Sequence, residues 1–245
     1  MTRGLMRALA PLALFALLAP APLAPVAPLA PLAPAAQAQF DHLVVAVRSL
    51  EEGVAEFERL TGVKAGVGGK HPDRGTENAL VSFGGGKYLE IIAPQAGVTL
   101  GPRDEPMRTL DRLRVINWAI SVSDVAGAVA ALKGGGFTAS PPQPGSRVTP
   151  AGERLEWTTF GLADPAIPVA PFFINWSAAT KHPSTTAPGG CEMLELKITD
   201  PASDRLSAAL GVLGMSGVTY AKGPLRIEAT IRCGSKTATL TTPTV

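Results

Sequence analysis

The 245-residue chain contains few cysteines, few aromatic side chains and no cluster of basic residues. Its 22 lysines and arginines are scattered among 20 aspartates and glutamates. Proteins that bind nucleic acids concentrate positive charge on one face or along one segment. This sequence has no such concentration, so it does not indicate a nucleic-acid partner.

Two familiar catalytic motifs are also missing. The segment GVGGKH resembles a phosphate-binding loop, but Lys70 is followed by His71 where that motif requires serine or threonine. No G-x-S-x-G sequence, the turn that presents a nucleophilic serine in many hydrolases, occurs in the chain. We therefore interpret the glycine-rich runs at 66–69 and 84–86 as turns.

Only two cysteines occur, Cys191 and Cys233. In an oxidising compartment such a pair can form a disulfide. On the chain-entropy model, a loop of this length would then contribute about 4 kcal/mol to the free energy of unfolding. Two buried free thiols are the alternative, and the sequence alone leaves both open.

The first 38 residues have the pattern of a secretory signal peptide. A positively charged start precedes an apolar run at 8–19, which is too short to span a bilayer. A repeating Pro/Ala/Leu tract then ends at Ala36–Ala38, which fits the small-x-small rule for cleavage. We predict a signal peptide over 1–38 and a mature chain that begins at Gln39. That chain would have no membrane span and would be periplasmic or secreted.

An internal repeat organises the remaining chain. Residues 40–57 and 115–132 share their apolar positions, and each reads as a strand followed by an amphipathic helix. Ser49 and Asp124 stand where helix N-caps are expected, and glycines follow each helix.

Three short apolar runs follow each of these helices and read as strands. They lie at 63–67, 78–83 and 88–93 in the first copy and at 136–140, 154–160 and 171–176 in the second. A third, less faithful pass begins with a strand near residue 190, a helix from Pro201 and three further strands. We expect this third unit to serve packing or capping.

The predicted fold class is α+β, with tandem β-α-β-β-β modules. The expected organisation is a first module at 39–100, a connecting helix at 101–114, a second module at 115–189 and a third, partial unit at 190–245.

Paired modules of this kind resemble the vicinal oxygen chelate superfamily, and the segments FDHLVVAVRSLEEGVAEFERLTGV and YLEIIAP resemble its glyoxalase-like branch. The resemblance covers roughly residues 40–235. It implies that each module forms a curved sheet and that two modules enclose an open cleft. It also implies a divalent metal bound there by residues of the first and fourth strands.

His42 and Glu90 occupy the matching positions in the first module, so the resemblance implies that they bind the metal. Zn, Fe, Mn or Ni would suit an imidazole and a carboxylate, and Glu90 would also be the candidate catalytic base. Glu90 lies in an apolar run, where a buried charge needs a partner. A buried hydrogen bond between the two side chains, with no metal, is the alternative.

The second module departs from this pattern. The repeat places Asn117 opposite His42, and the fourth strand offers Asn175. Asparagine is a poor ligand for these metals, and two good ligands fall short of the usual three. His71 and His182 are the remaining imidazoles, either over the cleft or in solvent.

Further side chains are candidates for binding a small organic molecule. Trp176 is one of three tryptophans in the second module, any of which could stack on an apolar ligand or belong to the core. The full set of expected substrate-binding residues is His71, Arg74, Asn78, Asn117, Asn175, Trp176 and His182.

The sequence therefore predicts an exported protein that acts on a small molecule in the cleft between the modules, by metal-assisted lyase, isomerase or dioxygenase chemistry. A protein that binds such a molecule without chemistry and without a cofactor is the alternative. An inactive module kept for protein–protein contact is a third interpretation. The oligomeric state is left open.

Overall fold

The computed structural model describes residues 38–167 and 170–242. The predicted signal peptide lies outside these residues except for Ala38. Among the described residues no helix has the length and apolar character needed to cross a membrane.

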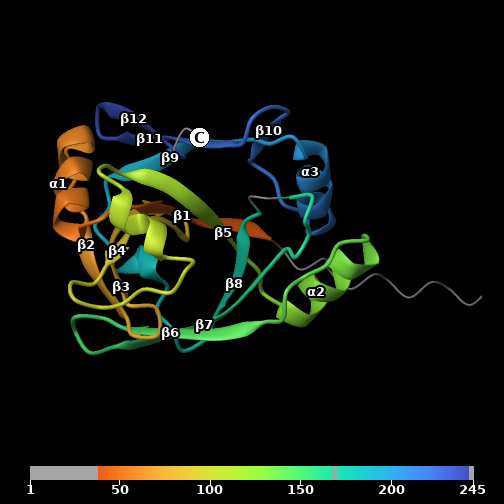
Figure 1. Ribbon diagram of the computed structural model, residues 1–245, viewed down its shortest axis with the longest axis horizontal. Helices are drawn as coiled ribbons and strands as arrows, with labels where there is room; N and C mark the ends of the chain where they lie inside the picture. The colour runs from red at the N-terminus through yellow and green to blue at the C-terminus, as the bar shows by residue number, and fades with distance from the viewer. Residues whose placement is uncertain (1–37, 168–169, 243–245) are drawn as a thin grey trace, which may run out of the picture. The chain divides into compact units, whose positions relative to one another are not determined.

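Strands and helices alternate in the same order three times (Figure 1). The first run is β1 (Gln39–Ala46), α1 (Leu50–Thr61), β2 (Gly66–His71), β3 (Thr76–Gly84) and β4 (Lys87–Pro94). The second is β5 (Arg114–Ser121), α2 (Val125–Gly134), β6 (Gln143–Val148), β7 (Arg154–Gly161) and β8 (Phe172–Trp176). The third is β9 (Cys191–Thr199), α3 (Ser203–Val212), β10 (Thr219–Ala221), β11 (Arg226–Cys233) and β12 (Lys236–Thr241).

The helix ends follow from local chemistry. The Ser49 side chain accepts a hydrogen bond from the Glu52 amide at the start of α1, and Gly62 ends the helix with φ +79°. The Asp124 side chain caps α2 in the same way by accepting from the Gly127 amide. Both predicted caps are confirmed.

The first eight strands form one closed barrel in the order β1-β4-β3-β2-β6-β7-β8-β5. β1 pairs antiparallel with β5, and β2 pairs with β6 on the other side. The predicted open cleft is therefore corrected to a closed barrel. The β2–β6 closure is narrow: it consists of the Lys70–Val148 pair, and the Arg147 guanidinium also donates to the Gly68 carbonyl.

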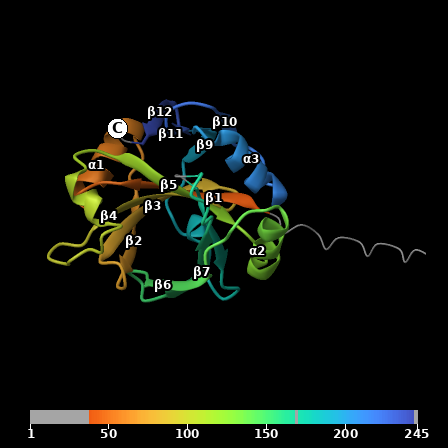
Figure 2. The ribbon, with the colours of Figure 1, turned by 45° about the vertical axis from the view of Figure 1, so that its right-hand side comes forward.

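The remaining strands form a separate four-stranded sheet, β10-β9-β11-β12. Figures 1 and 2 both show this sheet beside β5, and α1 beside β12. Its buried leucines and isoleucines belong to the same hydrophobic core as those of the barrel's outer face. A disulfide between Cys191 and Cys233 joins β9 to β11.

Three local expectations need correction. No regular strand forms at 136–140, where only Ala139 makes an isolated bridge, and β6 follows instead at Gln143–Val148. Pro144 is tolerated there because β6 pairs along its length with β7 alone. The connecting segment forms only a short 3-10 helix, Glu105–Thr109. The run 66–69 lies in strand β2 and is not a turn.

The glycines of β2 permit close approach of other groups. A Cβ at Gly68 would collide with the Asn78 amide, and a Cβ at Gly69, whose φ is +145°, would collide with the Val148 carbonyl. The turn predicted at 84–86 is confirmed, because β3 and β4 form a hairpin around it.

Alternation along the strands separates two environments. On β1, Leu43 and Val45 point outward into the main core, whereas His42 and Val44 line the barrel interior. The barrel is thus held from outside by helices and the second sheet, and its interior is lined by polar groups together with a smaller set of apolar side chains.

Gly53 provides a test of how closely α1 packs on the sheet. A Cβ at this position would lie 2.5 Å from Val47 Cγ1. We expect Gly53→Ala to lower the free energy of unfolding by about 1–3 kcal/mol through overpacking, although alanine favours helix by about 1 kcal/mol. Urea denaturation measures this.

Gly211→Ala is the matched control, because Gly211 lies in α3 with no atom within 4 Å of an added Cβ. That substitution should leave stability unchanged or raise it by up to about 1 kcal/mol. Equal effects of the two substitutions would contradict the packing described here.

Candidate functional site

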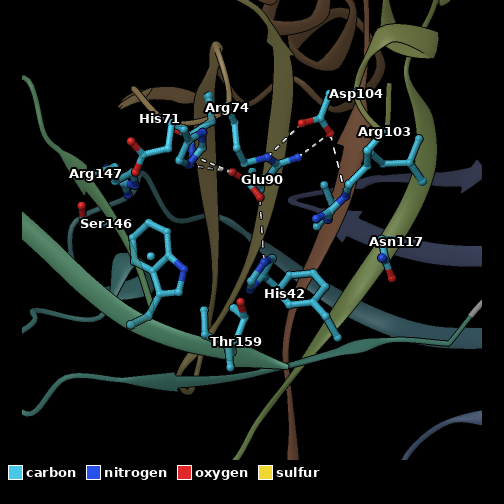
Figure 3. A pocket seen from close by; sticks show the side chains of 18 of the residues that line it. His42, His71, Arg74, Glu90, Arg103, Asp104, Asn117, Ser146, Arg147 and Thr159 are labelled. Carbon is cyan, nitrogen blue, oxygen red and sulfur yellow. Dashed lines mark hydrogen bonds and ion pairs between the residues drawn. The ribbon is translucent and has the colours of Figure 1, made fainter. Parts of the chain in front are cut away.

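The interior of the barrel contains a cavity of about 450 Å³, within the usual size range of small-molecule sites. Strands of both halves of the barrel contribute side chains to it, and the loop before β5 contributes Arg103 and Asp104. Figure 3 shows these side chains, with Glu90 between His71 and His42.

Glu90 is the central polar group of the cavity. Its Oε1 accepts a 2.6 Å hydrogen bond from Asn78 Nδ2 and lies 3.8 Å from His71 Nε2. Its Oε2 lies 3.8 Å from His42 Nε2. Burial alone would raise the pKa of Glu90, but His71, His42, Asn78 and Arg74 together hold it below the usual value. The carboxylate is therefore ionised in a largely buried place.

His42 is fixed from behind by Asp41. His42 Nδ1 lies 2.6 Å from Asp41 Oδ1, and its ring stacks on Tyr88 with centroids 4.5 Å apart. Burial would raise the pKa of Asp41, but hydrogen bonds with His182 and His42 hold it below the usual value. This arrangement directs His42 Nε2 into the cavity toward Glu90.

His71 is held at the end of β2, where its Nδ1 lies 3.1 Å from the Thr76 hydroxyl. Burial lowers the pKa of His71, and the attraction of Glu90 offsets this only in part. His71 is therefore neutral near pH 7, with its Nε2 facing the carboxylate.

Three arginines line the cavity, and they differ in their ion pairs and in their exposure to solvent. Arg74 forms a two-pronged ion pair with Asp104, at 2.7 and 3.1 Å. Arg103 has a side chain that is 73% exposed and lies 4.0 Å from Asp104. Arg147 is only 4% exposed, and burial lowers its pKa.

Most of the residues expected at the site do line the cavity. These are His42, Glu90, His71, Arg74, Asn78, Asn117 and Trp176. Asn117 uses its Oδ1 to accept from the Trp118 amide, so its side chain is partly engaged with its own strand.

His182 and Asn175 do not line this cavity. His182 sits behind the barrel wall, with Nε2 3.2 Å from Asp41 Oδ2 and Nδ1 2.8 Å from Ser184 Oγ. Asn175 donates to the carbonyls of Val122 and Ser123 on the other face of β8. The structure therefore places both residues outside this cavity, and their predicted contact with a ligand stays a prediction.

The strand registers explain the misplacement of Asn175. In the first half, Val44 pairs with Glu90. In the second half, the position corresponding to Val44 is Ala119, and it pairs with Phe172. Phe172 therefore occupies the place of Glu90, and the second half supplies no carboxylate there.

Several residues of the site were not among the predicted site residues, including Asp41, Arg147, Tyr88 and Trp157. The alternation of side chains along β1 places Asp41 on the outer face of the barrel. Its part in holding His42 therefore becomes visible only from its contacts with His182 and Trp176. Arg147 lies in a Pro/Gly-rich stretch that read as a loop. Tyr88 could have been found, because it shares the face of Glu90 on β4. Trp157 remained one of several candidate wall residues.

The predicted metal site has three donors that do not form one group. His42, His71 and Glu90 are suitable donors by type, but the two Nε2 atoms face different oxygens of Glu90. Within residues 38–167 and 170–242, no three His, Cys, Asp or Glu side chains form a group that could hold a metal ion. The residues thus do not fit a metal held by the usual three protein ligands.

Comparisons with known proteins bear on the family and the fold. A family model described as a glyoxalase-like domain matches residues 40–214. The solved structure of a hypothetical protein from Staphylococcus aureus is similar over 85% of this chain and 87% of its own, with a TM-score of 0.55 and 13% identity. No curated protein sequence is significantly similar to the chain.

Two further structures are similar over a smaller part of the chain. Methylmalonyl-CoA epimerase from Mycobacterium tuberculosis matches over 56% of this chain and 87% of its own, with 18% identity and a TM-score of 0.40. A hypothetical protein from Bacillus halodurans matches over 59% and 98%, with 19% identity and a TM-score of 0.44.

The family match extends from β1 to the end of α3 and so includes the whole barrel and its cavity. The Staphylococcus aureus structure is similar in its mixed α/β fold. The chain belongs to the glyoxalase-like domain family.

Proposed function

We propose that this protein is an enzyme that transfers a proton on a small organic molecule bound in the barrel, as an isomerase or lyase does. The observation that carries the proposal is the buried Glu90 with an imidazole 3.8 Å from each of its oxygens. Burying such a cluster costs free energy of folding. It places three groups that can accept or donate a proton in one cavity.

Glu90 is the proposed catalytic base. A substrate C–H bond next to a carbonyl would break, its electron pair would move toward the carbonyl oxygen, and the proton would move to Glu90. His71 or His42, each with Nε2 3.8 Å from a Glu90 oxygen, would then take that proton from Glu90 and return it to another atom of the substrate. Glu90 would again be ionised, and the imidazole would return to its starting state. These steps need no oxidant or reductant.

Our proposal narrows the chemistry expected from the sequence. Metal-assisted chemistry, including dioxygenase chemistry, depends on a metal. For this the described residues offer one imidazole on each side of Glu90 but no group of three donors. The proton transfer proposed here uses only side chains of the chain.

The proposal also includes the wider organisation of the protein. We infer that the three β-α-β-β-β runs are copies of one module and that the cavity lies between the first two. We further propose that residues 1–38 direct export, so that the protein acts in the periplasm or outside the cell. The order of elements supports the first inference, and the N-terminal sequence pattern supports the second.

Binding without catalysis is the second candidate function. Phe172 stands where the first half has Glu90, and Asn117 where it has His42. The second half therefore contributes no ionisable pair to the cavity, as would suit a protein that only sequesters its ligand.

Deuterium exchange separates these two functions. We expect the protein in D₂O to accelerate exchange of the acidic C–H bond in at least one member of a panel of 2-oxo acids and hydroxy ketones. Glu90→Gln should lower the rate by about 100-fold or more, because loss of a general base costs 10²–10⁴. Mass spectrometry measures the incorporation.

Glu195→Gln is the matched control, since Glu195 is exposed on β9 and outside the cavity. Its exchange rate should equal that of the unchanged protein. Ligand binding without any exchange across the panel would favour sequestration over catalysis.

Removal of metal tests whether the proposed proton transfer works without a metal. We expect dialysis against a chelator to change neither the thermal midpoint nor the exchange rate. In the proposed reaction only Glu90 and the two imidazoles transfer the proton, and no metal takes part. Elemental analysis of the purified protein accompanies the measurement. One equivalent of a transition metal that is lost in both His42→Ala and Glu90→Ala would overturn this account.

A further inference from the structure

Arg147 differs from the other charged side chains of the cavity. It lies on β6, is 4% exposed and lines the cavity beside Ser146 and Trp157. One guanidinium nitrogen donates to the Gly68 carbonyl. Within the described part of the chain, no other acceptor and no carboxylate is paired with this side chain.

The available carboxylates are already engaged. Asp104 accepts both prongs of Arg74. Glu90 accepts from Asn78 and faces the two imidazoles. Arginine carries five N–H donors and keeps its charge in proteins. Arg147 therefore has no directly paired carboxylate in the described ranges, although Glu90 is within Coulombic reach, and it presents free donors to the cavity.

The planar guanidinium favours a particular kind of anion. Its parallel N–H groups match the two oxygens of a carboxylate, and such charge-assisted pairs are the stronger hydrogen bonds of proteins. Figure 3 shows Arg147 near His71 and Ser146, on the opposite side of Glu90 from Arg103 and Asn117. An anion on Arg147 would thus lie to one side of the proposed base.

Another part of the wall is apolar. Val44, Met107, Leu110, Ile116 and Phe172 line the cavity and pack together in a small hydrophobic cluster. A ligand that fits both regions has a carboxylate at one end and an apolar body at the other.

We propose that the cavity selects small organic carboxylates with an apolar body and that Arg147 binds the carboxylate. This inference rests on the cavity assigned under the proposed function and names the class of its substrate. The bound negative charge would also raise the pKa of Glu90 and make it a better base.

Pairs of acids and neutral amides provide the test. Phenylacetate with phenylacetamide, and hexanoate with hexanamide, are titrated into the purified protein and followed by NMR. We expect each acid to bind about tenfold or more tightly than its amide. The Nε–H resonance of Arg147 should shift with the acids and not with the amides.

Arg147→Gln should reduce the preference for the acid to near unity, whereas Arg147→Lys should retain part of it. Arg226→Gln, an exposed arginine of β11 outside the cavity, is the matched control and should keep the full preference. Because loss of the contact with Gly68 could loosen the barrel, the amide affinity of each variant reports general damage to the cavity.

An unchanged protein that binds the acids no better than the amides overturns the inference. An acid preference that survives in Arg147→Gln overturns it as well. Glu90→Gln separates this result from the proposed function: it should bind the acids at least as tightly while it loses deuterium exchange. Acid binding that depends on Arg147, without exchange in any protein, would uphold the inference and reject the enzyme.

Discussion

The buried carboxylate of Glu90 is the constraint on which the interior of the barrel depends. An ionised group cannot be taken from water unless other groups replace its hydration. Here an amide, two imidazoles and a guanidinium within Coulombic reach do so. The two imidazoles and the guanidinium are themselves each fixed by a neighbour. Asp41 fixes His42, Thr76 fixes His71, and Asp104 fixes Arg74.

This dependence explains why the two halves of the barrel differ although their elements follow the same order. The first half supplies Glu90 and both imidazoles, and the second half supplies Phe172, Trp157 and Arg147. The groups that can exchange protons therefore lie on one wall of the cavity. The other wall offers aromatic side chains and one buried cation, Arg147. A substrate between them would meet its base on one side and its binding groups on the other.

Much of the fold could be predicted because its signals are local. Ser49 and Asp124 cap their helices through contacts within three residues, and alternation on β1 and β4 places His42 and Glu90 on one face. Strand β6 was missed because Pro144 and Gly145 are typical of loops, and only pairing with β7 makes the segment a strand.

The site was less predictable because it depends on register and on distant contacts. Asn175 was expected at the position that corresponds to Glu90, but the strand register places Phe172 at that position. This register cannot be read from the sequence because the loop before β8 differs in length from its counterpart in the first half. The contact between Asp41 and His182 joins residues 141 positions apart and has no local signature. The place of Arg147 in the cavity could not be predicted, because it depends on the closure of the barrel beside Gly68.

The ionisation of Glu90 is the central claim, and carbon NMR can measure it directly. Protein labelled at the glutamate carboxyl carbons would be titrated with acid, and Glu90→Gln would assign the resonance. The account predicts an ionised carboxylate at neutral pH, with a pKa below the usual value for glutamate. A Glu90 carboxyl that is protonated at neutral pH would show that burial outweighs the imidazoles and would contradict its role as a base.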